Sequence, residues 1–214
     1  MDGAGCSARV GRSLTECSMI FSATDLEGVI AIDLERHHDC RGYFARTMCR
    51  DELASQGLVV DYAQDSMSFN QRRGTLRGMH YQNAPYAETK LIRCVQGAVY
   101  DVLLDMRPGS KTYLRWQAFE LTAGNGKALY VPEGVAQGFQ TLADTTAVYY
   151  RISVPYAAHA AAGVRYDDPL VAIAWPEPVT VISERDASWP DLERYGERRQ
   201  LRAVPALTGN ENNA

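Results

Sequence analysis

The chain has 214 residues, of which 46% are hydrophobic, and its formal net charge at pH 7 is −4. This length and hydrophobic content are typical of one globular domain with a sizeable core. The acidic balance argues against nucleic-acid binding, which needs a basic face, although a local cationic cleft can still bind an anionic small molecule. No apolar run approaches the roughly 20 residues that span a bilayer. From the charge and the absence of such a run, we expect neither a nucleic acid nor a membrane as partner.

The two ends of the chain differ from its middle. Residues 1–18 have no apolar segment typical of a secretory signal and are predicted to form a disordered leader. Residues 191–214 are predicted to form a polar, partly disordered tail, which leaves residues 19–190 as the domain. The five cysteines are odd in number and include no CxxC pair, a pattern that indicates reduced thiols and a cytoplasmic location.

Short strand-like runs follow one another through the domain. The first covers 29–34, and a turn then leads into an extended piece at 39–44. A short helix is predicted over 51–56, ended by Gly57. Further strands, bounded by Gly, Pro, Asn or Asp, are predicted at 58–62, 74–81, 90–95, 98–106, 113–121, 127–131, 137–142 and 147–154. No helical pattern separates them, which favours an antiparallel sandwich or barrel over a βαβ sheet.

The run 98–106 is apolar on both faces apart from Asp101 and Asp105. A strand of this kind is covered on both sides, so we expect it in the middle of a sandwich or beneath a partner subunit.

One histidine lies in a segment that is predicted to be sheet core. His80 belongs to the run Gly-Thr-Leu-Arg-Gly-Met-His-Tyr-Gln at 74–82. A histidine beside fixed cations suits the removal of a proton from carbon, and a hydrogen-bonded structural histidine is the alternative. Candidate cations are Lys90, Arg77 and Arg151. Candidate acids are the phenols of Tyr149 and Tyr150, of which only one can face inward because neighbouring strand residues point to opposite sides. Asp186 is a candidate partner for the imidazole.

The run 131–139 (Val-Pro-Glu-Gly-Val-Ala-Gln-Gly-Phe) resembles the second motif of the cupin barrels, in which a histidine ligates a metal. The equivalent positions of a cupin metal site would be His80, Gln82 and Gln137. Glutamine is a poor ligand for Zn or Fe. We therefore predict an all-β, cupin-like antiparallel sandwich or jelly-roll barrel with a few short helices and no metal. A metal-dependent cupin oxygenase is the alternative.

From about residue 22 to 190 the chain resembles the dTDP-4-dehydrorhamnose 3,5-epimerase family. The residues that carry the resemblance are the DxRGxF run at 39–44, the run 74–82, Lys90, the PEG turn with Gly138-Phe139, Asp167-Asp168-Pro169, Ala174-Trp175-Pro176 and Ser183-Glu184-Arg185-Asp186. The family implies cofactor-free proton transfer on a nucleotide-linked 4-keto-6-deoxyhexose, with inversion at C3, C5 or both.

The resemblance also implies residue roles. His80 is the proton acceptor, Asp186 orients it, Tyr150 donates a proton from the opposite face, and Lys90 lies beside the keto group. The implied substrate-binding residues are Arg77, Gln64, Arg41, Phe44, Gln137, Tyr156 and Arg185. Tyr156 is expected to stack on the nucleotide base. Arg41 is expected to reach the nucleotide, and in this family the equivalent arginine often comes from the partner subunit. The family implies a homodimer that exchanges strands.

Several positions depart from the family pattern: its histidine near the sugar is Gln137 here, and other changes are Arg46, Ser66 and Ala161. Because the acid-base residues remain, we interpret these departures as a change of substrate. Three alternatives stay open: an epimerase that inverts one centre only, a 3,4-ketoisomerase, and a non-catalytic sugar-nucleotide binding module.

Overall fold

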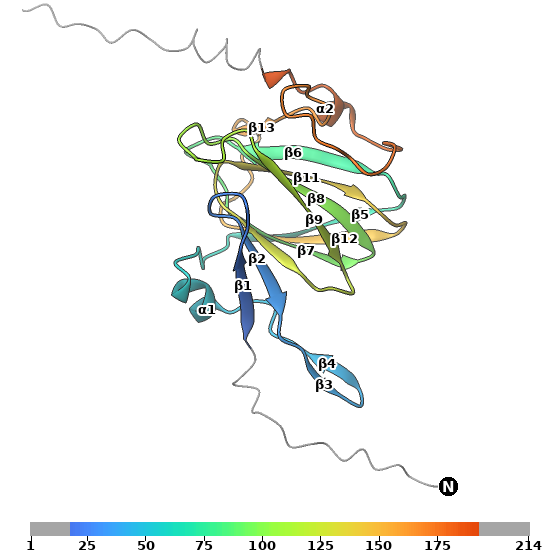
Figure 1. Cartoon of the computed structure of the whole chain (residues 1–214). Coiled ribbons are helices and arrows are strands. Elements are labelled where there is room, and N and C mark those ends of the chain that lie inside the picture. Colours follow the sequence, from blue (N-terminus) through green and yellow to red (C-terminus); the bar gives the residue numbers. More distant parts are fainter. Residues whose placement is uncertain (1–17, 193–214) are drawn as a thin grey trace, which may run out of the picture.

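Two antiparallel β-sheets packed face to face form the body of the protein (Figure 1). The computed structural model describes residues 18–192. The first sheet has the strand order β1-β2-β10-β7-β12-β5 and the second has the order β13-β6-β11-β8-β9. Several pairs of strands that follow one another in sequence, such as β7 and β8, lie in opposite sheets, as in a jelly roll.

The first sheet consists of β1 (Met19–Ala23), β2 (Ile30–Leu34), β5 (Gln64–Asn70), β7 (Lys90–Gln96), β10 (Ala128–Val131) and β12 (Thr146–Ile152). The second consists of β6 (Leu76–Gln82), β8 (Ala98–Asp105), β9 (Trp116–Thr122), β11 (Val135–Thr141) and β13 (Ala161–Gly163). Two short helices, α1 (Arg50–Ser55) and α2 (Glu184–Ala187), and a hairpin of β3 (His37–Asp39) and β4 (Gly42–Phe44) complete the described elements.

The main core lies between the sheets. Period-2 alternation sends one set of side chains from each strand into this layer, and its buried members include Ile92, Leu103, Leu129, Phe139 and Val148. Towards one end of the sandwich the inward-facing residues become polar. The functional site described below lies at that end.

The outer face of the second sheet is covered by the chain that follows β13. Val164, Val171 and Ile173 pack there against Val102 and Leu104 of β8. Strand β8 is therefore covered on both faces, as its sequence predicts, and a segment of the same chain provides the outer cover. On the first sheet, α1 places Leu53 against Ile32 and Tyr130.

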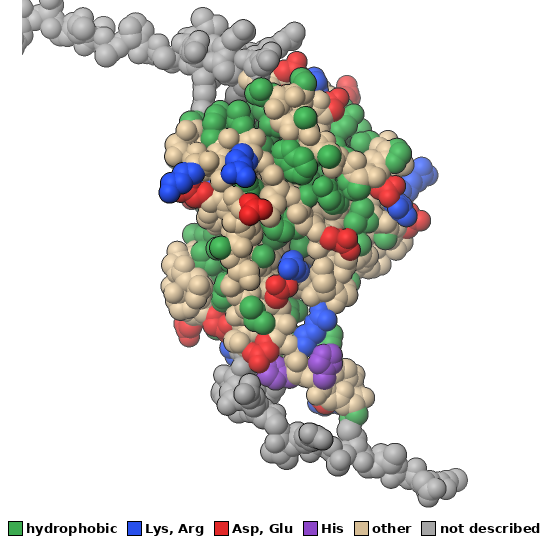
Figure 2. Space-filling view, in the orientation of Figure 1, with side chains coloured by type: hydrophobic (Ala, Val, Ile, Leu, Met, Phe, Trp, Pro, Cys, Tyr) green, Lys and Arg blue, Asp and Glu red, His purple; other side chains and the backbone are tan. Residues whose placement is uncertain are grey.

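The hairpin of β3 and β4 projects from the body of the molecule beside β1 and β2 (Figure 1). Tyr43 and Phe44 on this hairpin are at least half exposed. On the face drawn in Figure 2, basic and acidic side chains are interspersed over the described residues without a continuous basic surface.

The all-β, cupin-like prediction is confirmed, and the predicted helix is α1, one residue earlier. The strand predicted at 58–62 is wrong. Leu58, Val60 and Tyr62 alternate because they pack on the cluster around Leu53, without a partner strand. Strands β1, β3, β5 and β13 were not predicted. The sequence of β5 is Gln-Asp-Ser-Met-Ser-Phe-Asn, a run poor in strand-forming residues.

The prediction of reduced thiols holds for Cys49 and Cys94 and is wrong for Cys40, which is disulfide-bonded. The predicted leader and tail lie almost wholly outside the described residues. Within residues 18–192, no helix is long and apolar enough to cross a membrane.

Candidate active site

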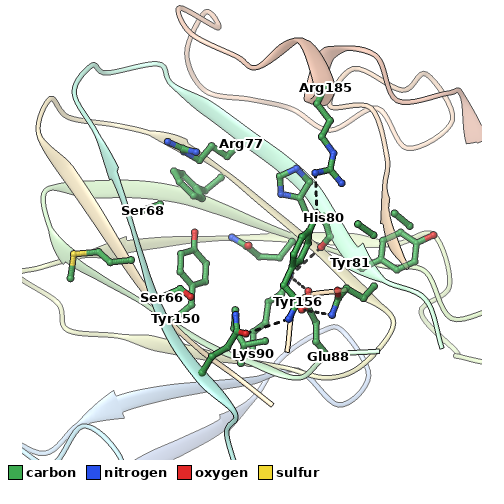
Figure 3. Close-up of a pocket in the computed structure, with 18 residues that line it drawn as sticks. Ser66, Ser68, Arg77, His80, Tyr81, Glu88, Lys90, Tyr150, Tyr156 and Arg185 are labelled. Carbon is green, nitrogen blue, oxygen red and sulfur yellow. Dashed lines mark hydrogen bonds and ion pairs between the residues drawn. The ribbon is translucent and has the colours of Figure 1, made fainter. Parts of the chain in front are cut away.

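A cavity of about 360 Å³ opens between the two sheets at the polar end of the sandwich (Figure 3). Strands β5, β7 and β12 of the first sheet form one wall, and β6 and β11 of the second sheet form the other. Eight residues predicted from the sequence line it together: Gln64, Arg77, His80, Lys90, Gln137, Tyr150, Tyr156 and Arg185.

His80 forms a close pair with Asp186. Its Nε2 atom lies 2.6 Å from Asp186 Oδ1, and its side chain is 42% exposed whereas that of Asp186 is 6% exposed. A carboxylate next to Nε2 favours the tautomer that carries its proton there. The neutral ring then keeps its basic lone pair on Nδ1.

Asp186 is held by backbone and side-chain donors. It lies in α2, where Ser183 caps the helix by accepting a hydrogen bond of 3.1 Å from the Asp186 amide. Asp186 Oδ2 accepts a second hydrogen bond of 3.2 Å from the Gly78 amide. Burial by itself raises the pKa of Asp186, but the hydrogen bond and charge of His80, with the Gly78 amide and Ser183, outweigh it and lower the pKa. The carboxylate is therefore ionised beside the imidazole.

Glycine lets the strand that carries His80 approach its neighbour closely. Gly78 has φ +123°, and a Cβ atom there would overlap the Cα atom of Gly138 on β11. A side chain at residue 78 would push β6 away from β11 and would move His80.

Tyr150 faces the cavity from the opposite sheet. It lies on β12, and its neighbour Tyr149 points to the outer face, where it lines a separate hollow with Arg93 and Arg151. Strand alternation left the choice between the two tyrosines open and the family resemblance implied Tyr150, and the register of β12 turns Tyr150 towards the cavity. Burial raises the pKa of the Tyr150 phenol, which keeps it protonated and able to act as an acid.

Lys90 is paired with a carboxylate. Its Nζ atom lies 2.9 Å from Glu88 Oε1, and the two side chains are 8% and 10% exposed. Lys90 also donates to the His80 carbonyl oxygen at 3.3 Å. Gln82 donates to the other Glu88 oxygen at 3.0 Å. This network fixes the ammonium group between the two sheets.

Gln137 is paired with a fully buried carboxylate. Gln137 Nε2 donates to Asp101 Oδ2 at 2.7 Å, and Asp101 has no exposed surface. Burial raises the pKa of Asp101 to about 8, although the hydrogen bond from Gln137 and the charge of Lys90 act in the other direction.

Aromatic and basic side chains form the mouth of the cavity. Tyr156 is 56% exposed, and its hydroxyl accepts a hydrogen bond of 3.2 Å from Arg185. Gln64 accepts a hydrogen bond from the Tyr156 amide at 3.3 Å. Deeper in, Arg77 Nε donates to Asn70 at 2.8 Å. An exposed ring beside the Arg185 guanidinium group suits a nucleotide with its phosphates.

Two predicted residues lie away from the cavity of their own chain. Arg41 and Phe44 are on the β3–β4 hairpin, where Arg41 forms an ion pair with Asp39 of the same turn and its side chain is 87% exposed. Their role in binding substrate stays a prediction.

The chain is similar to known proteins in sequence and in structure. A family model for dTDP-4-dehydrorhamnose 3,5-epimerase matches residues 23–194. A dTDP-4-dehydrorhamnose 3,5-epimerase from Sinorhizobium fredii is 41% identical over 179 residues, which cover 81% of this chain and 90% of the relative. The chain belongs to the dTDP-4-dehydrorhamnose 3,5-epimerase family.

Other members of this family extend the comparison. A dTDP-4-dehydrorhamnose 3-epimerase from Streptomyces niveus is 36% identical, covering 75% of this chain and 78% of the relative. The crystal structure of dTDP-4-dehydrorhamnose 3,5-epimerase from Bacillus anthracis with TDP and PPi bound has a TM-score of 0.79. It is 35% identical and covers 81% of this chain and 99% of that one.

Glu88 and Asp101 are the residues of this epimerase-family site that the sequence did not single out as functional. Each had a signal. Glu88 precedes Lys90 by two residues in an extended segment, which places both side chains on one face. Asp101 is a charged residue in an apolar strand, and a buried carboxyl group needs a partner.

The structure also bears on the cupin metal positions. The amide nitrogen of Gln82 donates hydrogen bonds to Glu88 and to the Tyr86 carbonyl oxygen, and the amide nitrogen of Gln137 donates one to Asp101. Over the part of the chain that the structure describes, no group of three or more His, Cys, Asp or Glu side chains could hold a metal ion. Catalysis without a metal stays a prediction, which metal analysis of the purified protein can check.

Proposed function

We propose that this protein epimerises a dTDP-linked 4-keto-6-deoxyhexose at C3, C5 or both by proton transfer without a cofactor. One observation carries the proposal: the His80–Asp186 pair occupies one wall of the cavity, and the protonated phenol of Tyr150 occupies the other. A base and an acid on opposed faces of one carbon are what inversion requires.

The keto group at C4 acidifies the hydrogens on C3 and C5. His80 takes one of these protons at Nδ1, and Asp186 stabilises the imidazolium that forms. Placing the base at hydrogen-bond distance from its orienting carboxylate removes the need to reorganise water around the new charge.

The negative charge that develops on the C4 oxygen needs nearby cations. Lys90 and Arg77 both line the cavity and supply them. Oriented donors at such an oxyanion are typically worth a few kcal/mol each. Tyr150 then protonates the carbon from the other face, and the centre inverts.

The mouth of the cavity binds the nucleotide in this proposal. The Tyr156 ring stacks on the base, and Arg185, tied to the Tyr156 hydroxyl, contacts the diphosphate. Gln64 supports this loop through the Tyr156 amide.

A second copy of the chain completes the site. Met67 and Phe69 on the outer face of edge strand β5, with Tyr43 and Phe44 on the hairpin, are each at least half exposed. Large apolar side chains gathered on an edge strand and on a projecting hairpin suit a homodimer. The hairpin would carry Arg41 into the cavity of the other subunit.

Mixing two inactive variants tests the dimer. If Arg41 acts in the partner subunit, a refolded 1:1 mixture of Arg41→Ala and His80→Ala chains regains about a quarter of the wild-type active sites. Activity that stays at the level of the separate variants contradicts this arrangement.

Deuterium exchange tests the reaction itself. With dTDP-4-keto-6-deoxyglucose in D₂O, we expect NMR to show deuterium at C3, C5 or both, and epimerised product. His80→Ala should lose exchange, whereas His159→Ala, which removes an exposed histidine that does not line the cavity, should keep it. A shifted carbonyl would indicate a ketoisomerase, and tight binding without exchange would indicate a binding module. Exchange at C3 alone would assign the single-centre activity.

A further inference from the structure

The pairing of Gln137 with Asp101 determines what kind of group the cavity presents to the sugar. Gln137 lies on β11 directly opposite His80 on β6, so the two side chains emerge side by side from the same face of the sheet. Any substrate whose carbon reaches His80 must also meet Gln137.

Asp101 lies behind Gln137 as seen from the cavity. Strands β8 and β11 pair so that Asp101 is opposite Phe139, which puts Asp101 and Gln137 on one face as diagonal neighbours. Gln137 lines the cavity, and Asp101 is fully buried and is not among the residues that line it. The carboxyl group therefore does not contact the substrate itself, and its hydrogen bond reaches the cavity through Gln137.

The hydrogen bond sets the orientation of the amide. In a carboxamide only the nitrogen donates, and Asp101 Oδ2 accepts this hydrogen bond both when the carboxyl group is ionised and when its proton is on Oδ1. The 2.7 Å contact thus holds Gln137 Nε2 against Asp101 and turns the carbonyl oxygen, Oε1, the other way. Among the residues that the structure describes, no side chain or amide donates to that oxygen.

We propose that Asp101 is a positioning residue that turns the Gln137 carbonyl oxygen towards the sugar, which makes Gln137 the acceptor for a sugar hydroxyl beside the carbon that His80 deprotonates. This inference rests on the proposed function. A carbonyl oxygen cannot donate to the C4 keto oxygen and repels the enolate that forms there. The C4 oxygen therefore lies on the Lys90 side, and a neighbouring ring hydroxyl lies on the Gln137 side.

Binding measurements with matched ligands test the proposal. The ligands are dTDP, dTDP-6-deoxy-D-glucose, and the 2-deoxy and 3-deoxy forms of that sugar nucleotide. For the wild type, we expect removal of one of the two hydroxyls to weaken binding about fivefold to tenfold, the usual effect of one neutral hydrogen bond. We call the fold-loss of affinity on removal of that hydroxyl the hydroxyl ratio. In Gln137→Leu the hydroxyl ratio should fall to about one, while the affinity for dTDP, which lacks the hexose, stays unchanged.

Asp101→Leu tests the positioning role. This substitution leaves Gln137 in place but removes the carboxyl group that orients its amide. The hydroxyl ratio should therefore fall towards one, while the affinity for dTDP is retained. If Asp101→Leu does not fold, Asp101→Asn replaces it. An asparagine amide can also donate to Gln137 and lets its amide turn over, so the ratio should drop at least about twofold.

Each result decides between the proposals. A wild-type protein indifferent to both hydroxyls, or a Gln137→Leu or Asp101 variant with an undiminished hydroxyl ratio, would overturn the inference and would not bear on the proposed function. Absence of deuterium exchange in the wild type with every nucleotide 4-keto sugar tried would instead overturn the proposed function.

Discussion

Burial of Asp101 makes the stability of this protein depend on pH in a way that one substitution can isolate. The pKa of Asp101 rises from 3.8 to about 8 in the folded chain because burial penalises its charged form. Between pH 3.8 and about pH 8, the Asp101 carboxyl group has lost its proton in the unfolded chain and has kept it in the folded chain. The unfolded state therefore binds fewer protons, and the free energy of unfolding falls as pH rises through this window.

The size of the effect follows from the shift. Each pKa unit corresponds to about 1.4 kcal/mol, so the full shift is worth about 6 kcal/mol above pH 8. Water penetration and relaxation around a buried charge reduce such penalties, and we expect about 2–4 kcal/mol in practice. Asp101→Asn keeps the shape and the acceptor for Gln137 but cannot ionise, so it removes this loss.

Urea denaturation from about pH 5 to about pH 9 measures the effect, because urea does not screen charge. The stability of Asp101→Asn relative to wild type should grow steadily with pH across this range. Asp51→Asn is the matched control, since it removes one acidic group from the exposed first turn of α1 and reports the effect of net charge alone. A difference that stays flat, or that shrinks as pH rises, would refute the reasoning.

Three further predictions concern the site. Tyr150→Phe should lower formation of epimerised product by about a hundredfold or more. Deuterium should still enter the substrate through His80, since only the opposite-face acid is lost. NMR distinguishes deuterium in the substrate from formation of the epimerised product. Ser183→Ala should cost about 1 kcal/mol of stability by urea denaturation and should lower kcat more than it raises KM, because the cap holds the segment that carries Asp186. Gly78→Ala should yield little folded protein by circular dichroism, because its Cβ meets the backbone of Gly138, whereas Gly109→Ala, in open space, should fold normally.

The fold class and much of the site could be predicted from local pattern. Alternating apolar residues with turn residues between them define most strands, and the motif residues identify His80, Lys90 and Asp186. The failures to predict strands correctly have one cause. Strand β5 is polar and is a strand because it pairs with β12, whereas 58–62 alternates without any partner strand. Pairing depends on the rest of the chain, and alternation shows only that one side is buried.

The residue pattern by itself predicted an antiparallel β-sandwich or barrel and made His80 a candidate base, and the family resemblance added the cupin-like jelly roll and the residue roles, because side-chain periodicity and motif spacing are local properties. Only the tertiary structure decided which groups meet. His80 contacts Asp186, which lies 106 positions away in the sequence, and the register of β8 and β11 places Gln137 beside Asp101. The register of β12 decides that Tyr150, rather than Tyr149, faces the cavity. Strand register and burial are set by packing over the whole sandwich, and they assign each polar side chain its partner and its protonation state.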